Sequence, residues 1–258
     1  MSLLEPQTPN DRIIVALDGL DVFQALDLVD LLGDHVGGFK LGLEFQQKML
    51  TSVATESPLE MMRVCEAYRK LIQRLAGKLM WDGKFHDIPN TMAGAMEALK
   101  QLRPTFVTVH ASAGLDGVRK AVTCTSVSHI IGVTVLTSLS KEDCHEIYGD
   151  SPNEKVLYFA DILLRAQASG IVCSPQELST LKEQQKLKKL IRIVPGVRPT
   201  WASTNDQNRV ATPFVAITQG ADFLVIGRPI TQPPTVIGSP IEAAERIADE
   251  ILSALRKG

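Results

Sequence analysis

The chain has 258 residues, 45% hydrophobic and 22% charged, a composition typical of a globular protein with a large core and not of a disordered one. Lys and Arg number 27 and Asp and Glu 29, so a formal charge of -2 excludes a global positive field for nucleic acid or an anionic membrane. Any anionic ligand must therefore be held by a local site.

The cysteines and the N-terminus bear on localisation. The four cysteines are widely spaced and form no CxxC pair, so we interpret them as reduced thiols of a cytosolic protein. The opening residues MSLLEPQTPNDR lack the basic and apolar regions of a signal peptide, and no apolar run reaches the ~18 residues of a membrane span. These features predict a cytoplasmic protein with no membrane partner.

Eight short runs rich in Val, Ile, Leu and Phe recur along the chain, each followed by a segment of helical character. They span residues 12–17, 37–42, 78–83, 105–110, 129–136, 170–174, 191–196 and 222–227. Continuous apolar runs are typical of parallel strands that are covered on both faces. The pattern therefore indicates a parallel sheet with helices outside it.

The segments between these runs carry helix signals. Residues 22–33 place Val22, Leu26, Val29 and Leu32 on one stripe, with Gly33 as a stop. Residues 44–77 are too long for one ordinary helix and are broken at TSVATESP (51–58), which predicts two helices. Ser174, Pro175 and Glu177 form a capping-box pattern at the start of a further helix.

Two polar segments are predicted to be irregular. Residues 137–155 read as a loop with a short helix, long enough to serve as a lid, and residues 198–213 as an irregular loop.

The chain thus contains eight strand–helix units and no linker. This pattern favours an α/β fold of the (β/α)8 TIM-barrel type, with residues 1–258 as a single domain. A doubly wound sheet is the less favoured alternative.

Charged residues collect at the expected strand ends, where barrel enzymes build their active sites. Asp82 and Lys84 lie two positions apart on one strand and should touch, and Lys40 lies on the neighbouring strand. Nearby carboxylates keep a lysine protonated, so such an array can supply a proton donor. The alternative is a structural ion-pair network that only holds the loop.

A second cluster lies after the seventh and eighth runs. Barrels frequently bind phosphate there. The loops read PGVRP (195–199) and IGRPIT (226–231), so each combines a glycine that permits close backbone approach with an arginine, Arg198 or Arg228. The pair predicts a phosphate site, although each glycine taken alone has a simple turn as its alternative explanation.

These motifs together resemble the orotidine 5'-phosphate decarboxylase family over almost the whole chain. The resemblance rests on D-x-K-x-x-D-I-P-N-T (82–91), VALD (15–18), FKLG (39–42), VHASAG (109–114), VTVLTS (133–138), VCSPQE (172–177), PGVRP (195–199) and VIGRPIT (225–231). The D-x-K-x-x-D core alone is shared with other barrels. Gly83 departs from the pattern, since the family often has a larger residue there.

The resemblance implies a cofactor-free decarboxylase that converts orotidine 5'-phosphate into UMP. It makes Lys84 the proton donor, with Asp82, Asp87 and Lys40 completing the catalytic set. It implies a homodimer in which Asp87, Ile88 and Thr91 reach into the neighbouring subunit's pocket. The substrate-binding residues that it implies are Asp18 at the ribose, Thr137 near the base, Arg198, Gln207, Gly227 and Arg228 at the phosphate, and also Lys40 and Ser138.

Two other classes remain open: a metal-dependent sugar-phosphate lyase, and a barrel that binds a nucleotide without reacting. His86 and His110 invite the metal interpretation, but Mg²⁺ prefers several oxygen ligands and two lysines among the acids would repel it. We therefore expect no metal, and we expect His110 to be a hydrogen-bonded residue of the pocket wall. The chain has no GxGxxG motif, which argues against a dinucleotide cofactor.

Overall fold

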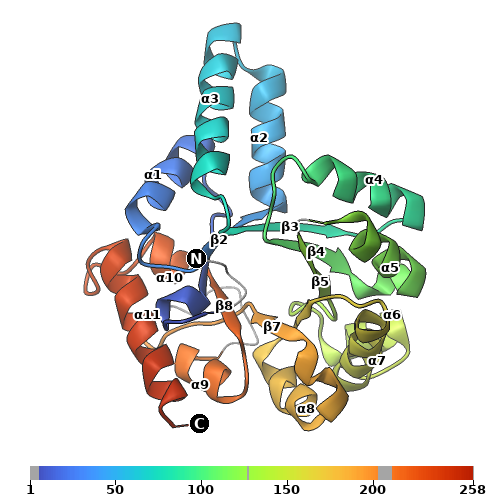
Figure 1. Ribbon diagram of the computed structural model, residues 1–258. Coiled ribbons are helices and arrows are strands. Elements are labelled where there is room, and N and C mark those ends of the chain that lie inside the picture. Colours follow the sequence, from blue (N-terminus) through green and yellow to red (C-terminus); the bar gives the residue numbers. More distant parts are fainter. Residues whose placement is uncertain (1–5, 127, 203–210, 258) are drawn as a thin grey trace.

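Residues 6–126, 128–202 and 211–257 are described by this computed structural model, and within these ranges eight parallel strands close into a barrel (Figure 1). Each strand pairs with the next along the chain, and the last pairs with the first. The strands are β1 (Ile13–Ala16), β2 (Gly38–Gly42), β3 (Leu79–Phe85), β4 (Phe106–His110), β5 (His129–Val133), β6 (Gly170–Val172), β7 (Ile191–Val194) and β8 (Phe223–Ile226). The predicted single-domain (β/α)8 barrel is confirmed, and a doubly wound sheet is excluded because the sheet has no edge.

Helices surround the barrel and connect successive strands (Figure 1). They are α1 (Val22–Leu32), α2 (Leu43–Thr55), α3 (Pro58–Arg74), α4 (Pro89–Leu99), α5 (Gly114–Cys124), α6 (Lys141–Tyr148), α7 (Pro152–Arg165), α8 (Leu178–Glu183), α9 (Pro213–Thr218), α10 (Arg228–Thr231) and α11 (Pro240–Leu255). Short 3-10 turns lie at Asn10–Arg12, Ala111–Ala113, Pro175–Glu177 and Gln185–Lys189. None of the helices in the described ranges is both long and apolar enough to cross a membrane.

Side chains alternate between two apolar layers along each strand. Ile14 of β1 points into the barrel, where it packs with Phe106 and Phe223, whereas Ile13 and Val15 face the surrounding helices. Successive strand residues point to opposite faces, which is why continuous apolar runs fill both layers. Because these side chains fill the barrel interior, we expect a ligand site above them, at the carboxyl ends of the strands.

Several elements are shorter than their apolar runs. β5 ends at Val133, although the predicted run continues to residue 136, because the ladder with β6 ends where Val133 pairs with Val172. The helix predicted after Ser174 is split into a 3-10 turn, α8 and a second 3-10 turn, and its capping box is present as predicted. The four cysteines all lie in the described ranges and form no disulfide there, as expected for reduced thiols.

The two helices predicted between residues 44 and 77 are confirmed as α2 and α3. Ser57 caps α3 by accepting a hydrogen bond from the Glu60 amide, and Pro58 occupies the first helical position. In Figure 1 the two helices run side by side and project away from the barrel. The predicted short helix in the loop after β5 is also present, as α6.

Candidate active site

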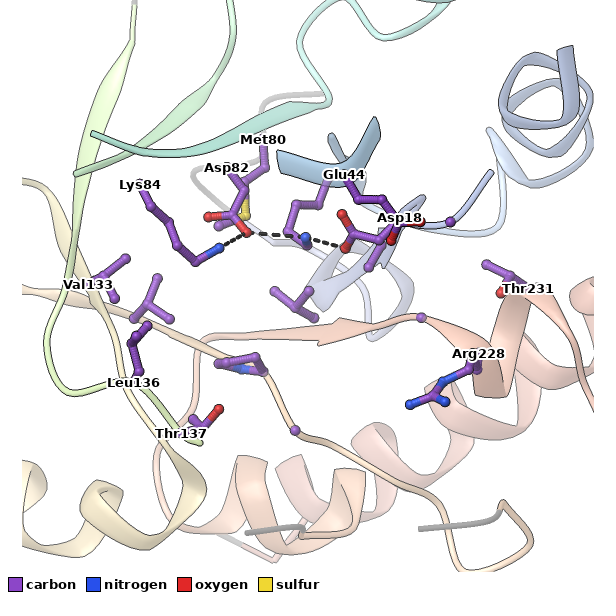
Figure 2. A pocket seen from close by; sticks show the side chains of 18 of the residues that line it. Asp18, Glu44, Met80, Asp82, Lys84, Val133, Leu136, Thr137, Arg228 and Thr231 are labelled. Carbon is purple, nitrogen blue, oxygen red and sulfur yellow. Dashed lines mark hydrogen bonds and ion pairs between the residues drawn. The ribbon is translucent and has the colours of Figure 1, made fainter. Parts of the chain in front are cut away.

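A cavity of about 590 Å³ opens at the carboxyl ends of the strands (Figure 2). Most of the residues predicted to form a site line it, namely Asp18, Lys40, Asp82, Lys84, Thr137, Arg198, Gly227 and Arg228. Figure 2 shows Asp18, Asp82 and Lys84 in one row along the cavity, with Thr137 and Arg228 across from them. The structure therefore joins the charged array and the arginine loops in one space, as the barrel topology predicts.

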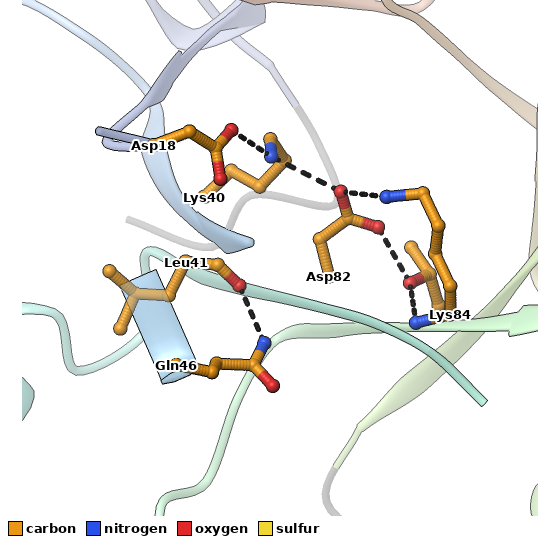
Figure 3. Close-up of polar contacts among 7 residues, drawn as sticks. Asp18, Lys40, Leu41, Gln46, Asp82 and Lys84 are labelled. Atoms are coloured by element: carbon orange, nitrogen blue, oxygen red, sulfur yellow. Dashed lines mark hydrogen bonds and ion pairs between the residues drawn. The ribbon is translucent and has the colours of Figure 1, made fainter. Parts of the chain in front are cut away.

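The charged residues form a continuous chain of alternating sign (Figure 3). The Lys84 ammonium lies 2.7 Å from Oδ2 of Asp82, and Lys40 Nζ lies 3.1 Å from the same oxygen. Lys40 Nζ also lies 2.5 Å from Oδ2 of Asp18. One carboxylate oxygen of Asp82 thus serves two ammonium groups, as in the predicted array.

Because the array is buried, the attraction between its charged groups is strong enough to shift their pKa values. Burial opposes a charge on Lys40, yet the carboxylates of Asp82 and Asp18 attract its proton and raise the pKa of Lys40 above its usual value. Burial also opposes ionisation of Asp82. Attraction to Lys40 and Lys84, with hydrogen bonds from Lys84 and Thr108, nevertheless lowers the pKa of Asp82 below its usual value. At neutral pH, Lys40 is a cation and Asp82 an anion.

A bulge in β3 presents Lys84 to the cavity. The register of β3 against β4 shifts between Trp81 and Phe85, and Lys84 has a φ of 45°, in the left-handed region that non-glycine residues rarely adopt. A Cβ added at Gly83 within the bulge would lie 2.6 Å from the Phe85 ring. A larger residue at position 83 would therefore require the Phe85 ring to move.

Two residues that contact or make room for the charged array escaped the sequence prediction. Thr108 of β4 donates a hydrogen bond of 2.8 Å to Oδ1 of Asp82, and its position one strand away, two residues before His110, was the available signal. Gly42 ends β2, where an added Cβ would lie 2.0 Å from Asp18 Oδ1 and 2.8 Å from Lys40 Nζ. Only glycine leaves room there for the ion pair between Asp18 and Lys40.

The arginine loops form the opposite part of the cavity. Arg198 is buried, at 7% exposure, and its amide donates to the Ala211 carbonyl. Gly196 has a φ of 75°, in the left-handed region that favours glycine, so the backbone turn by itself accounts for a glycine at this position. A Cβ added at Gly227 would lie 3.6 Å from the nearest side chain, an ordinary contact, so packing within the chain does not require glycine at 227.

Some predicted residues do not join this cavity. Asp87, Ile88, Thr91 and Ser138 are exposed and lie outside the cavity lining, and Ile88 is 67% exposed. The Asp87 carboxylate accepts a hydrogen bond of 2.7 Å from the Ile88 amide. Within one chain, Asp87 is therefore not a partner of Lys84. Gln207 lies outside the described residues.

The histidines do not form the predicted pocket wall. His110 lies outside the cavity lining, with its ring 5.6 Å from that of His86, so the prediction for His110 is wrong in its placement. Burial, with the nearby charges of His86 and Lys84, lowers the pKa of His110. Among the described residues, no three His, Cys, Asp or Glu side chains gather as a metal site.

Comparison with known proteins decides the family. Residues 11–247 match the model of the orotidine 5'-phosphate decarboxylase / HUMPS family. The chain belongs to this family. The resemblance seen in the sequence motifs is therefore confirmed.

Relatives of the family align over nearly their entire length. An orotidine 5'-phosphate decarboxylase of Gloeothece citriformis is 39% identical, over 94% of this chain and 98% of its own. One of Syntrophomonas wolfei is 36% identical, over 93% and 98%. The crystal structure of a third, from Lactobacillus acidophilus, superposes with a TM-score of 0.71 at 30% identity, covering 93% of this chain and 98% of that one.

Proposed function

We propose that this protein decarboxylates orotidine 5'-phosphate to UMP and CO2 in pyrimidine biosynthesis, in the cytoplasm and without a metal or cofactor. The observation that carries the proposal is the chain of alternating charge from Asp18 to Lys84, inside the one cavity that also contains Arg198 and Arg228. The names of the curated relatives support the same reaction.

The chemical difficulty of this reaction lies in the electron pair left on the pyrimidine ring. When the bond between C6 and the carboxylate breaks, the pair stays on C6 in the ring plane, where no π-delocalisation is available. The Lys84 ammonium, held 2.7 Å from Asp82, stabilises this charge because it is fixed before the reaction begins. Lys84 then transfers a proton to C6, and solvent restores the proton to Lys84.

Asp82 has two roles in this proposal. Its carboxylate fixes the ammonium groups of Lys40 and Lys84 through one shared oxygen. Because Asp82 is 6% exposed, its charge is poorly screened by water and disfavours the substrate carboxylate before CO2 leaves. We give the first role more weight, because it rests on contacts within the chain.

The other residues that the family resemblance assigns to the substrate would bind it away from the reacting carbon. Asp18 and Lys40 are assigned to the ribose hydroxyls, and Thr137 to the base. The phosphate is assigned to Arg198, Gln207, Gly227 and Arg228. Arginine forks suit phosphate oxygens, and the position of Arg228 across the cavity from Lys84 leaves room for a nucleotide between them (Figure 2). Binding energy at the phosphate can thereby support the chemistry at C6.

We further propose a homodimer in which Asp87, Ile88 and Thr91 complete the partner's site. Asp87 and Ile88 lie just after β3, are exposed, and do not line the cavity that contains Lys84. The Ile88 side chain is apolar and 67% exposed, so it is accessible to a partner subunit. In the dimer, Asp87 would approach Lys84 of the other subunit.

One spectrophotometric assay tests the proposed reaction against its alternatives. The purified protein is incubated with orotidine 5'-phosphate, with and without EDTA, and the absorbance of the substrate is followed. We expect the absorbance to fall at the same rate in both. A metal-dependent lyase would stop on chelation, and a barrel that only binds nucleotides would bind UMP and leave the substrate unchanged.

A further inference from the structure

Thr108 links the two parts of the Asp82–Lys84 unit. Its side chain is fully buried, at 0% exposure, on the inner side of β4. The hydroxyl donates a hydrogen bond of 2.8 Å to Oδ1 of Asp82 and accepts one of 2.9 Å from the backbone amide of Lys84. One hydroxyl thus contacts both the carboxylate that holds the ammonium and the backbone that carries it.

The bond to the Lys84 amide falls where the strand ladder is interrupted. β3 and β4 pair at Trp81 with Val107 and again at Phe85 with Val109, so the residues between them lie in the bulge. The Lys84 backbone adopts a φ of 45° there, a strained conformation that a non-glycine residue keeps only where the surrounding structure enforces it. Because of the bulge, the Lys84 amide has no hydrogen-bond partner in the β3–β4 ladder, and the Thr108 hydroxyl accepts its hydrogen bond instead.

The two acceptor oxygens of Asp82 have separate tasks. Oδ2 accepts from Lys40 and Lys84, whereas Oδ1 accepts from Thr108. A hydrogen bond to Oδ1 sets the rotation of the carboxylate, and this rotation directs Oδ2 at the two ammonium groups. Small displacements of a reacting group lower rates strongly, so this orientation matters for turnover.

We propose that Thr108 is a positioning residue, which holds the Lys84 ammonium in its reactive place through Asp82 and through the strained Lys84 backbone. The inference rests on the proposed decarboxylase function and deepens it. Thr108 does not line the cavity, so it acts on the substrate only through these two residues.

The test compares three variants. Thr108→Val keeps the size and β-branching of the side chain and removes both hydrogen bonds, while Thr108→Ser keeps the hydroxyl. Thr134→Val is the matched control, because Thr134 is equally buried and its hydroxyl donates to the Val172 carbonyl, away from the charged array. Circular dichroism and thermal melting establish that each variant is folded.

The steady-state constants for orotidine 5'-phosphate are the first measurement. We expect Thr108→Val to lower kcat by about 10- to 100-fold with little change in KM, because the substrate contacts are intact and only the reacting group is displaced. Thr108→Ser and Thr134→Val should stay close to the wild type. A folded Thr108→Val enzyme with unchanged kcat, or a Thr108→Ser enzyme as impaired as Thr108→Val, would overturn the inference.

The second measurement is the pH at which kcat/KM falls on the acid side of its pH profile, here called the acid limb. If the role of Thr108 were purely structural, this pH would not change. The charged and titratable groups around Asp82 in the described chain are Lys40 of β2, Lys84 of β3, Asp18 after β1 and His110 at the end of β4. All four remain in Thr108→Val. Loss of a hydrogen bond to the carboxylate raises the pKa of Asp82, so the acid limb should move to higher pH. An unmoved limb counts against the inference.

The outcomes separate the two proposals. A wild-type enzyme that does not consume orotidine 5'-phosphate overturns the proposed function, and this inference with it. An active wild type with an unaffected Thr108→Val overturns the positioning role alone. If the valine variant does not fold, Thr108→Ala replaces it under the same two criteria.

Discussion

The Lys84 ammonium lies 2.7 Å from Oδ2 of Asp82, although a bulge separates their backbones within β3. The bulge turns the Lys84 backbone to a positive φ, and the long lysine side chain returns to the carboxylate (Figure 3). The same oxygen is shared with Lys40, so a change at any of the three residues alters the other two.

Removing the Lys84 ammonium should abolish turnover. We expect Lys84→Ala to lower kcat by at least about 10³-fold, since both charge stabilisation and proton donation are lost. Lys120→Ala, at an exposed lysine of α5, is the control and should match the wild type in the absorbance assay. Near-normal turnover by Lys84→Ala would refute the role assigned to this residue.

Neutralising Asp82 should change stability in a pH-dependent way. The folded pKa of Asp82 is lowered, so its ionised form stabilises the fold above the unfolded pKa of about 3.9, and this contribution is lost as the pH falls through the folded value. We expect Asp82→Asn to lose roughly 1–3 kcal/mol at pH 7, because Lys40 and Lys84 are left with less compensation.

Thermal melts from pH 7 down to pH 2 measure this effect. The difference in melting temperature between the wild type and Asp82→Asn should become smaller below about pH 4. Asp116→Asn, at a carboxylate whose side chain is 83% exposed, serves as the control. A gap of constant size over the whole range would contradict the linkage to Asp82.

A single methyl group at Gly42 should disrupt the array. The added Cβ of Gly42→Ala would lie 2.0 Å from Asp18 Oδ1, so Asp18 must move away from Lys40. We expect a fall of about tenfold or more in kcat/KM, since the ribose contacts assigned to Asp18 and Lys40 are displaced. Gly94→Ala is the matched control, because its added Cβ meets nothing within 4 Å and should raise stability by about 0.5–1 kcal/mol.

The arginine across the cavity should matter for substrate use more than for the chemistry itself. We expect Arg228→Ala to lower kcat/KM by about 100-fold or more while leaving measurable turnover at high substrate concentration, since a charged fork to phosphate is lost. Arg165→Ala, at an arginine of α7 that is 58% exposed, should be unaffected. Equal losses in both variants would argue against a phosphate site at Arg228.

Shared sites can be tested by mixing two inactive enzymes. Lys84→Ala and Asp87→Ala dimers, unfolded and refolded together in equal amounts, should form hybrids with one intact site and recover about a quarter of the wild-type activity. Each variant refolded alone is the control and should remain inactive. No recovery in a mixture shown to contain hybrids would mean that Asp87 does not act across the interface.

The sequence alone determined the architecture and most of the cavity. Continuous apolar runs at regular intervals report burial on both faces, and burial of this kind requires a parallel sheet covered by helices. Once the barrel is inferred, the residues after each run must meet at one end, which is why Asp18, Lys40, Asp82, Lys84 and Arg228 were found as a group. Ser138, which lies in one such position, is nevertheless exposed and outside the cavity lining.

Only the tertiary structure decided how these groups are held. The bulge in β3, the bonds from Thr108 and the close approach at Gly42 depend on how neighbouring strands are aligned, and the residues of one strand do not specify that alignment. Periodicity along the chain reports which side of an element is buried. The contacts between residues 26 positions apart, such as Thr108 and Asp82, arise only when the closed barrel sets the register between their strands.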